Sequence, residues 1–282
     1  MTTGEAITYS TGKLQALYGP GEAGAMTALL LEKLTGLRGA GLLSRSRGDI
    51  SESQYRELNV YLQRLAEQEP IQYVLEEAWF AGLKFYVDAS VLIPRPETEE
   101  LVQWIIDDRR YRPSAIRVLD IGTGSGCIPL ALKHKLANLV VDAIDVSDEA
   151  LAVARKNAEL LALVVNFMAI DFLVPQHQTA LGTYDIIVSN PPYIPGRERR
   201  NMQPNVLEHE PATALFVPDE DPLIFYKAIA AFGKDHLEVG GSIYVEIFEE
   251  LGQETLEVFE AAGYNAELQN DMQGKNRMIR AR

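Results

Sequence analysis

The sequence is poor in the residues that build disulfides, metal sites and membrane spans. Its single cysteine, Cys127, cannot form an internal disulfide, and its four histidines lack the spacing of metal ligands. It contains no run of 18 apolar residues and no N-terminal signal with a basic start and an apolar core. We therefore expect a cytoplasmic protein that binds no metal and contacts no membrane.

Basic residues are also scarce, and this limits the partners that the chain can have. It carries 26 lysines and arginines against 40 aspartates and glutamates, a formal charge of −14. Such a charge repels nucleic-acid phosphates, so we expect no direct sequence-specific binding of nucleic acid. With 47% hydrophobic residues and only 21 glycines and 14 prolines, the chain has a globular composition. Its 282 residues suggest one large domain and a small one.

Apolar residues in the first seventy positions recur at helical spacing. Gly19-Pro20-Gly21 separates the first two helices, and Ser51 with Gln54 predicts a capping box that opens the third. Residues 1–88 carry 8 basic and 11 acidic side chains, a net charge of −3, which is unlike a nucleic-acid-binding arm. We predict a helical bundle over residues 1–77 that docks a protein substrate. The apolar positions are Leu14, Leu17, Tyr18, Ala28, Leu29, Leu31, Leu34, Tyr55, Leu58, Leu62 and Leu65.

A loose alternation of apolar and polar residues follows between Trp79 and Ile93. It predicts a β-hairpin that links two domains over residues 78–95. Pro96, with Glu97 and Glu99 behind it, then opens a helix, because proline and acidic residues are favoured in a first helical turn. We place the second domain at residues 96–282.

Short β-rich runs alternate with helical stretches from residue 116 onward. This rhythm predicts an α/β fold whose parallel sheet is covered by helices on both faces. The last two runs are separated by too few residues for a crossover helix, which predicts an antiparallel hairpin at the end of the chain. The expected strands are 117–121, 139–144, 164–169, 184–189, 242–247, 264–268 and 277–280.

A glycine-rich turn directly follows the first expected strand. Glycine has no Cβ, so a nucleotide ligand can approach the backbone closely, and the turn implies a nucleoside site. The dinucleotide pattern GxGxxG would need its third glycine where the chain has Cys127 or Pro129, which weakens an NAD interpretation. The turn instead resembles the S-adenosylmethionine loop of class I methyltransferases. It consists of Gly122, Thr123, Gly124, Ser125 and Gly126.

Further candidates for the nucleoside site stand at the ends of the next two strands. Asp145 lies 19 residues after Gly126 and can accept hydrogen bonds from both hydroxyls of a ribose. Asp171 and Phe172 resemble the pair that contacts adenine in class I methyltransferases. The alternative for this pair is a solvated aspartate beside a core phenylalanine.

The most specific motif is Asn190-Pro191-Pro192-Tyr193, directly after the fourth strand, at the edge where open α/β sheets bind ligands. The prolines have no N–H, so the Pro191 carbonyl and the Asn190 side-chain oxygen would form a wall that only accepts hydrogen bonds. Such a wall suits a substrate NH2, and Tyr193 can stack on a planar group. The motif therefore favours chemistry at an amide or at a nucleobase amine.

Together these motifs resemble the release-factor glutamine methyltransferase family. Further matching runs are 70–73, 92–101, 210–215 and 277–278, although the family often has glycine where this chain has Glu76. The resemblance implies a class I, Rossmann-like fold with a mostly parallel seven-stranded sheet, an N-terminal helical bundle and S-adenosylmethionine as cofactor. It also implies methyl transfer to the N5 side-chain nitrogen of the glutamine in the Gly-Gly-Gln motif of peptide chain release factors. We expect a monomer.

The resemblance also assigns roles to residues. The cofactor would contact Gly122, Thr123, Gly124, Ser125, Gly126, Asp145, Asp171, Phe172 and Asn190. The glutamine amide would be held by Asn190, Pro191, Pro192 and Tyr193, with Asn190, Pro191 and Tyr193 as catalytic residues. Glu246, at the end of the fifth strand, would be a nearby acceptor or the partner of Arg277, and these two possibilities stay open.

Three alternatives compete with this interpretation. A ribosomal-protein glutamine methyltransferase would share the Asn-Pro-Pro-Tyr motif, and the sequence does not separate the two substrates. An adenine-N6 or guanine-N2 methyltransferase shares the motif too, but the acidic charge disfavours nucleic acid. A non-catalytic interaction protein is disfavoured by the intact glycine turn, Asp145 and Asn190.

Overall fold

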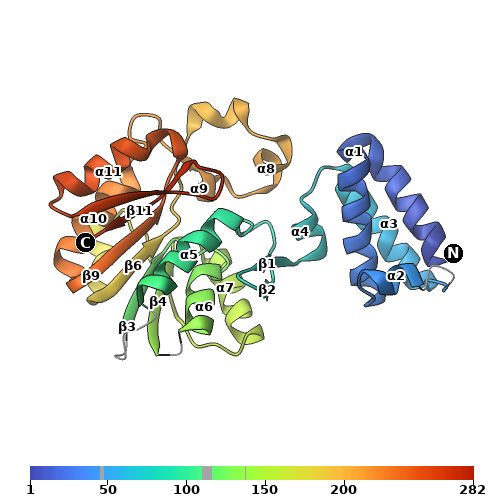
Figure 1. Ribbon diagram of the computed structural model, residues 1–282, viewed down its shortest axis with the longest axis horizontal. Coiled ribbons are helices and arrows are strands. Elements are labelled where there is room, and N and C mark those ends of the chain that lie inside the picture. Colours follow the sequence, from blue (N-terminus) through green and yellow to red (C-terminus); the bar gives the residue numbers. More distant parts are fainter. Residues whose placement is uncertain (45–47, 110–115, 137) are drawn as a thin grey trace. The chain divides into compact units, whose positions relative to one another are not determined.

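The computed structural model describes residues 1–44, 48–109, 116–136 and 138–282 (Figure 1). They form two compact units. The first unit joins Met1–Glu77 to a separate segment, Gln203–His209. The second joins Ala78–Met202 to Glu210–Arg282. None of the helices in the described ranges combines the length and the apolar character that crossing a bilayer requires.

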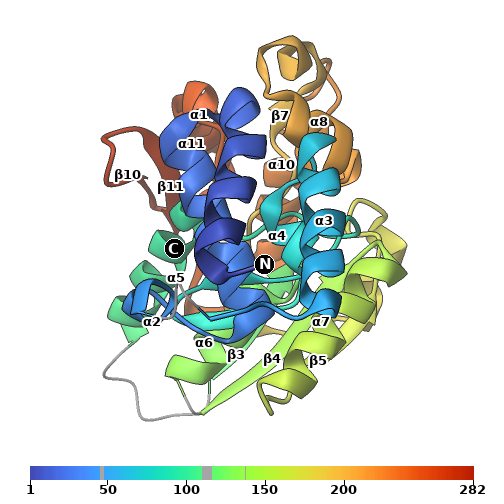
Figure 2. The same ribbon diagram turned by 90° about the vertical axis from the view of Figure 1, so that its right-hand side faces the viewer.

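The first unit is helical. Its helices are α1 (Thr3–Thr35), α2 (Ala40–Ser44), α3 (Glu52–Ala66), α4 (Ile71–Leu75) and α8 (Pro204–His209). Figure 2 shows α1 and α3 side by side, and the Tyr18 hydroxyl in α1 donates a hydrogen bond to the Leu65 carbonyl in α3. Buried leucines from both helices form the core, but Leu17, Ala28 and Leu29, which the sequence placed at the same helical spacing, are exposed.

Local signals in the sequence set the ends and the break of these helices. The predicted capping box of Ser51 and Gln54 opens α3. The predicted break in the first helix is also confirmed, because Gly19 leaves helical geometry at φ 76° and ψ 167°. Glu76 ends α4 in the left-handed region at φ 53°, which explains why glycine is favoured there. A glutamate in that conformation costs about 1–2 kcal/mol.

The second unit begins with a short hairpin of β1 (Ala78–Phe80) and β2 (Leu83–Phe85). The predicted hairpin between Trp79 and Ile93 is therefore correct only in its first half. Residues 86–95 form no strand, because the backbone turns at Asp88. The Asp88 side chain accepts a hydrogen bond from the Ser90 N–H, and its carbonyl accepts one from the Val91 N–H.

A seven-stranded sheet forms the centre of the second unit, with the order β10-β11-β9-β6-β3-β4-β5. The five strands from β9 to β5 are parallel, while β11 runs antiparallel to both β9 and β10. The predicted sheet and its terminal hairpin are confirmed. The strands are β3 (Ile116–Ile121), β4 (Leu139–Asp145), β5 (Asn166–Ala169), β6 (Tyr184–Ser189), β9 (Leu237–Glu246), β10 (Ala266–Asn270) and β11 (Asn276–Ala281).

Three strands begin at least two residues away from the predicted start, and β5 begins at Asn166 rather than Val164. β9 begins at Leu237 rather than Ser242, because Leu237 pairs with Tyr184 before the ladder shifts register. β10 begins at Ala266 rather than Tyr264, because Tyr264 lies in the turn after the preceding helix, where its N–H bonds to the Phe259 carbonyl.

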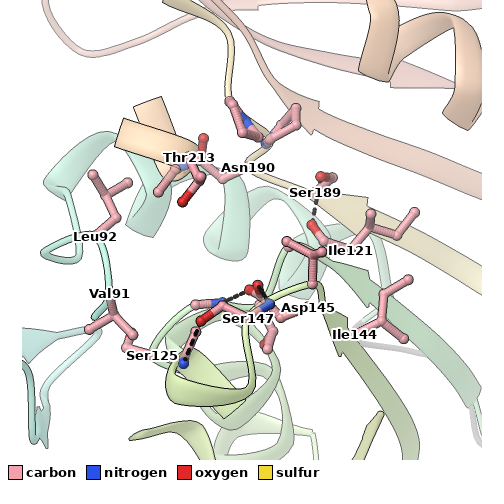
Figure 3. A pocket seen from close by; sticks show the side chains of 18 of the residues that line it. Val91, Leu92, Ile121, Ser125, Ile144, Asp145, Ser147, Ser189, Asn190 and Thr213 are labelled. Carbon is pink, nitrogen blue, oxygen red and sulfur yellow. Dashed lines mark hydrogen bonds between the residues drawn. The ribbon is translucent and has the colours of Figure 1, made fainter. Parts of the chain in front are cut away.

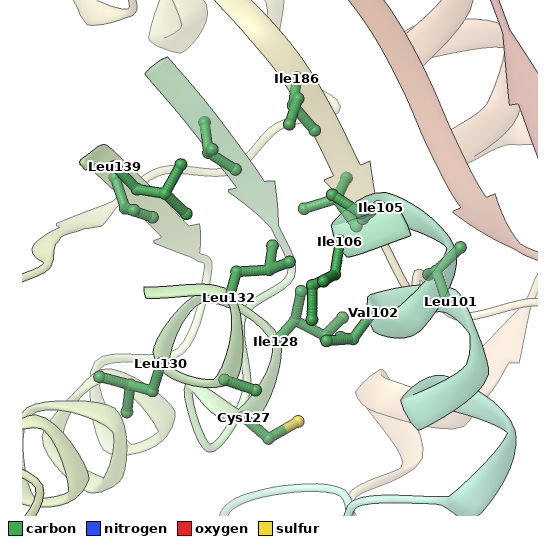
Figure 4. Close-up of a cluster of buried hydrophobic side chains, with 14 of the residues drawn as sticks. Leu101, Val102, Ile105, Ile106, Cys127, Ile128, Leu130, Leu132, Leu139 and Ile186 are labelled. Carbon is green, nitrogen blue, oxygen red and sulfur yellow. The ribbon is translucent and has the colours of Figure 1, made fainter. Parts of the chain in front are cut away.

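Alternate strand residues face two separate hydrophobic cores. On one face Val118 and Ile186 pack with residues of α5 (Pro96–Arg109) and α6 (Cys127–Lys135), as Figure 4 shows for this cluster. On the other face Leu119 and Ile187 pack with α10 (Ile224–His236) and α11 (Gly252–Ala261). The remaining elements of the described residues are α7 (Asp148–Leu160), α9 (Ala212–Leu215), the paired short strands β7 (Ile194–Pro195) and β8 (Phe216–Val217), and short 3-10 helices at Pro175–Ala180, Gly196–Asn201 and Glu249–Leu251.

Candidate functional site

A pocket lies at the carboxyl ends of β3, β4, β5 and β6, the edge at which open α/β sheets bind ligands. It is a cleft open to solvent, with a volume of about 1050 Å³ when the solvent space at its mouth is included. Figure 3 shows Asp145 and Ser147 on one side of it and Asn190 and Thr213 on the other. Of the residues predicted for the site, the pocket is lined by Gly122, Thr123, Gly124, Ser125, Asp145, Asp171, Phe172, Asn190, Pro191 and Pro192.

The glycine turn between β3 and α6 needs its glycines for two different reasons. Gly122 and Gly124 have φ values of 73° and 53°, and a Cβ on either would meet no atom within 4 Å. Gly126, at φ 78°, does not line the pocket, and its Cβ would lie 3.2 Å from the Cβ of Ala154 in α7. The first two glycines therefore leave open space at the pocket, whereas the third lets α6 and α7 approach each other.

Asp145 braces this turn. Its carboxylate accepts the N–H of Gly124 at 2.8 Å and the N–H of Ser147 at 3.0 Å. Burial raises the pKa of Asp145, while these backbone hydrogen bonds oppose the rise. A carboxylate offers about four acceptor positions, so the backbone donors do not use all of them and a ligand hydroxyl can still be accepted.

Buried polar atoms without partners lie next to the turn. Within the described residues, the carboxylate oxygens of Asp120 and the hydroxyls of Thr123 and Ser125 have no hydrogen-bond partner. Burial raises the pKa of Asp120 to about 7, the nearby Thr123 side chain opposes this rise, and the charge of Asp145 adds to it. Buried polar groups are seldom left unpaired. Thr123 and Ser125 line the pocket and fit a ligand that carries polar groups of its own, whereas Asp120 is fully buried and does not line it. Open glycines, the carboxylate of Asp145 and the unpaired hydroxyls of Thr123 and Ser125 together fit a polar nucleoside such as S-adenosylmethionine, and the contact of Asp145 with a ribose stays a prediction.

Asp171 and Phe172 both line the pocket, as a nucleobase contact would require. Phe172 is buried and packs edge-on against Phe232, with ring centroids 5.3 Å apart. Asp171 accepts the backbone N–H of Leu173. The structure brings both residues to the site, and their contact with adenine stays a prediction.

The opposite wall comes from the segment after β6. The Ser189 hydroxyl donates to the Ile121 carbonyl at 2.7 Å and ties the ends of β6 and β3 together. Asn190, Pro191 and Pro192 then line the pocket. Tyr193 is not among the lining residues, because its ring stacks on Phe248 at 6.3 Å and 19°. The structure thus brings three of the four motif residues to the pocket and places Tyr193 beside it.

The sequence analysis missed one functional candidate, Thr98, and left the role of another, Glu246, open. Thr98 lines the pocket, and its hydroxyl donates to the buried Glu246 carboxylate at 2.6 Å. Arg277 forms its ion pairs with Glu249 and Asp271, each at 3.2 Å, so Glu246 is held by hydroxyl groups instead. Thr98 belongs to the run 92–101 that carried much of the family resemblance, and this was the available signal.

An ion pair joins two segments of the pocket rim. Arg95 contacts Glu210 at 2.5 Å, and the Ile93 N–H donates to the same carboxylate. Glu210 is only 5% exposed. Its neighbour Pro211 lines the pocket together with Pro94. The pair therefore connects the segment before α5 to the segment before α9.

Comparison with known proteins supplies the family. The Methyltransferase small domain matches residues 100–214, and the PrmC N-terminal domain matches residues 5–75. The release factor glutamine methyltransferase of Flavobacterium psychrophilum is 42% identical over 96% of this chain and 97% of its own. That of Bacteroides thetaiotaomicron is 44% identical over 97% of both chains. The chain belongs to the release factor glutamine methyltransferase family.

This membership confirms the family predicted from the sequence. A solved structure agrees on the fold: the hMettl16 catalytic domain, in complex with the MAT2A 3'UTR hairpin 6, has a TM-score of 0.54 and 17% identity, with 82% of each chain covered. At that identity the likeness concerns the architecture alone. The predicted methyltransferase fold is confirmed.

Proposed function

We propose that this protein transfers a methyl group from S-adenosylmethionine to the side-chain amide nitrogen of the glutamine in the Gly-Gly-Gln motif of peptide chain release factors. The observation that carries the proposal is one pocket with two unlike walls. Gly122, Gly124 and Asp145 suit a nucleoside on one side, and Asn190 with Pro191 suits an NH2 group on the other. The names of the relatives support the release factor as substrate.

The residues divide the work of holding the cofactor. Gly122 to Ser125 would surround its amino-acid part, Asp145 would accept the ribose hydroxyls, and Asp171 with Phe172 would contact the adenine. When bound, S-adenosylmethionine supplies a methyl group on a positively charged sulfur. Gly126 supports this wall from behind by packing α6 on α7.

Orientation of the glutamine is the main task of the other wall. An amide nitrogen is a weak nucleophile, so alignment with the methyl group should supply much of the rate, on the order of 7–11 kcal/mol. The Asn190 side-chain oxygen and the Pro191 carbonyl would accept the two N–H bonds of the amide. These acceptors stabilise the positive charge that grows on nitrogen as it is methylated. The extra proton can leave to water, so no side chain is needed as a general base.

The substrate can be tested against its alternatives in one experiment. Labelled S-adenosylmethionine is incubated with the protein and, separately, with release factors, ribosomal proteins, DNA and RNA. We expect label on the release factors, lost when their Gly-Gly-Gln glutamine is replaced by alanine. Label on a ribosomal protein or on nucleic acid instead would reassign the substrate.

We further propose that the helical unit docks the release factor, and that the protein acts as a cytoplasmic monomer. The separate helical core supports the first point. Hydrogen exchange of the intact chain can test it, because a docked release factor should slow exchange in peptides from residues 3–75. If exchange slows only in peptides that line the pocket, the helical unit has no docking role.

A further inference from the structure

A chain of hydrogen bonds leads from a buried carboxylate to the substrate wall of the pocket. The Thr98 hydroxyl in α5 donates to Glu246 at the end of β9, 2.6 Å away. The Asn190 side-chain NH2 donates to the Thr98 hydroxyl oxygen at 3.1 Å. The Tyr193 hydroxyl donates to the second oxygen of Glu246 at 3.0 Å. Three elements far apart in the sequence thus meet behind Asn190.

Burial fixes which atoms donate and which accept in these hydrogen bonds. Glu246 is 1% exposed and Thr98 is 2% exposed, so solvent hardly competes for their hydrogen bonds. Burial raises the pKa of Glu246, but the two hydroxyl donors of Thr98 and Tyr193 oppose this rise and stabilise the ionised carboxylate, which can only accept. The one hydroxyl proton of Thr98 is therefore committed to Glu246. Towards Asn190 the Thr98 oxygen can act only as an acceptor.

This direction decides how the Asn190 amide lies. An asparagine amide has two orientations of nearly equal shape, related by a half-turn, and its hydrogen-bond partners alone distinguish them. An acceptor at Thr98 favours the orientation with NH2 towards Thr98 and with Oδ1 on the opposite side. The reversed orientation would set oxygen against oxygen at Thr98.

We propose that Glu246 and Thr98 are positioning residues, which select the orientation of Asn190 in which its Oδ1 is free to accept a hydrogen bond from the substrate NH2. The proposal rests on the proposed function for the identity of that substrate. In the reversed orientation, the Asn190 NH2 would face the glutamine NH2, donor against donor. One acceptor for the reacting nitrogen would then be lost.

The first test is a double-mutant cycle on single-turnover methyl transfer to a release factor at saturating cofactor. Thr98→Val keeps the shape of the side chain but removes the acceptor, and we expect the rate to fall about tenfold. Thr98→Ser keeps the hydroxyl and should recover most of that loss. In an Asn190→Ala background Thr98→Val should change the rate by less than about twofold, because Thr98 acts through Asn190.

A matched control separates this effect from a general loss of packing. Thr255 is also fully buried and donates its hydroxyl to the Leu251 carbonyl, in α11 and outside the pocket. Thr255→Val should lower stability and leave the single-turnover rate unchanged. If the effects of Thr98→Val and Asn190→Ala on the rate multiply in the double variant, the proposal is overturned.

The second test needs no turnover. The side-chain NH2 signals of Asn190 in a nitrogen-15 spectrum are those missing in Asn190→Ala. We expect slow exchange with water for the proton that faces Thr98, faster exchange in Thr98→Val, and slow exchange again in Thr98→Ser. Fast exchange in the unmodified protein would overturn the positioning role. Absence of label on release factors, with exchange as expected, would instead overturn the proposed function.

Discussion

The Tyr193 hydroxyl donates a hydrogen bond to the buried carboxylate of Glu246, 3.0 Å away. The motif tyrosine therefore supports a buried charge behind the pocket, while its ring stacks on Phe248. The stacking of Tyr193 on a substrate group, which the sequence predicts, stays a prediction. The hydrogen bond to Glu246 gives Tyr193 an electrostatic role that can be measured without substrate.

Replacing Tyr193 by phenylalanine should destabilise the protein in a pH-dependent way. Burial already raises the pKa of Glu246, and loss of the Tyr193 donor should raise it further. A carboxyl with a raised folded-state pKa contributes stability that is full at acidic pH and lost as the pH rises through that pKa. The variant should therefore lose about 1.5–3 kcal/mol at pH 8 and less at pH 5, measured by urea unfolding. Tyr226→Phe is the control, because its hydroxyl bonds to the Glu246 main-chain carbonyl, and its loss should be equal at both pH values.

Asn190→Ala tests the substrate wall directly. It removes one preorganised acceptor, and such a loss typically lowers kcat by about 10²- to 10³-fold. Cofactor affinity, measured by calorimetric titration, should fall much less than turnover. Ser189→Ala is a suitable comparison, since it removes the hydrogen bond to the Ile121 carbonyl. It should lower the free energy of unfolding and change kcat much less than Asn190→Ala does. An alanine variant within about threefold of the unmodified rate would mean that the proline backbone alone orients the amide.

Asp145→Ala should weaken cofactor binding. The substitution removes the acceptors for the ribose hydroxyls and also frees the N–H groups of Gly124 and Ser147. We expect a loss of about 1.5–3 kcal/mol in binding free energy, measured by calorimetry. Unchanged affinity would remove Asp145 from the cofactor site.

Asp120 should make folding stability depend on pH. Burial raises its pKa from 3.8 to about 7, so its contribution to stability is full below pH 3.8 and lost as the pH rises through about 7. A shift of this size corresponds to about 4 kcal/mol as an upper bound. Asp120→Asn should flatten this part of the profile in urea unfolding, whereas Glu254→Gln, on the exposed surface of α11, should not. Parallel profiles for Asp120→Asn and the unmodified protein would contradict the assignment.

The glycine turn offers a matched pair of substitutions. Gly124→Ala meets no neighbouring atom and should cost only its backbone strain, about 1–2 kcal/mol. Gly126→Ala has the same backbone problem and also places a Cβ 3.2 Å from Ala154 and Leu130. We expect it to lower the free energy of unfolding more than Gly124→Ala does. Gly124→Ala should in turn weaken cofactor binding more than Gly126→Ala does. The reverse order of either effect would contradict the role of Gly124 at the pocket and that of Gly126 between α6 and α7.

The fold could be predicted from the sequence wherever local pattern decides it. Gly19, the capping box of Ser51 and the β-rich runs act on their nearest neighbours, and the structure confirms them. The half-correct hairpin shows the limit, because apolar alternation at Val87 and Val91 reflects burial without any strand pairing.

The site was predicted less completely for a related reason. Asp145 ends β4 and Asn190 directly follows β6, so the parallel sheet alone brings them to one edge. The partnership of Thr98 with Glu246 spans 148 positions and depends on how α5 packs against β9. The position of Tyr193 beside the pocket likewise depends on Phe248, which no local pattern connects to it.

The helical unit is discontinuous, and this bears on how such proteins can be recombined. Its short helix α8 is encoded between Met202 and Glu210, inside the stretch that otherwise builds the sheet unit. The His209 ring contacts the Glu67 carbonyl, so α8 has a bonded partner in the N-terminal stretch. A chimera that exchanged only residues 1–77 would pair a foreign bundle with the resident α8. A graft of the helical unit should therefore exchange both residues 1–77 and residues 203–209. Exchanging the first segment alone is not expected to transfer substrate specificity.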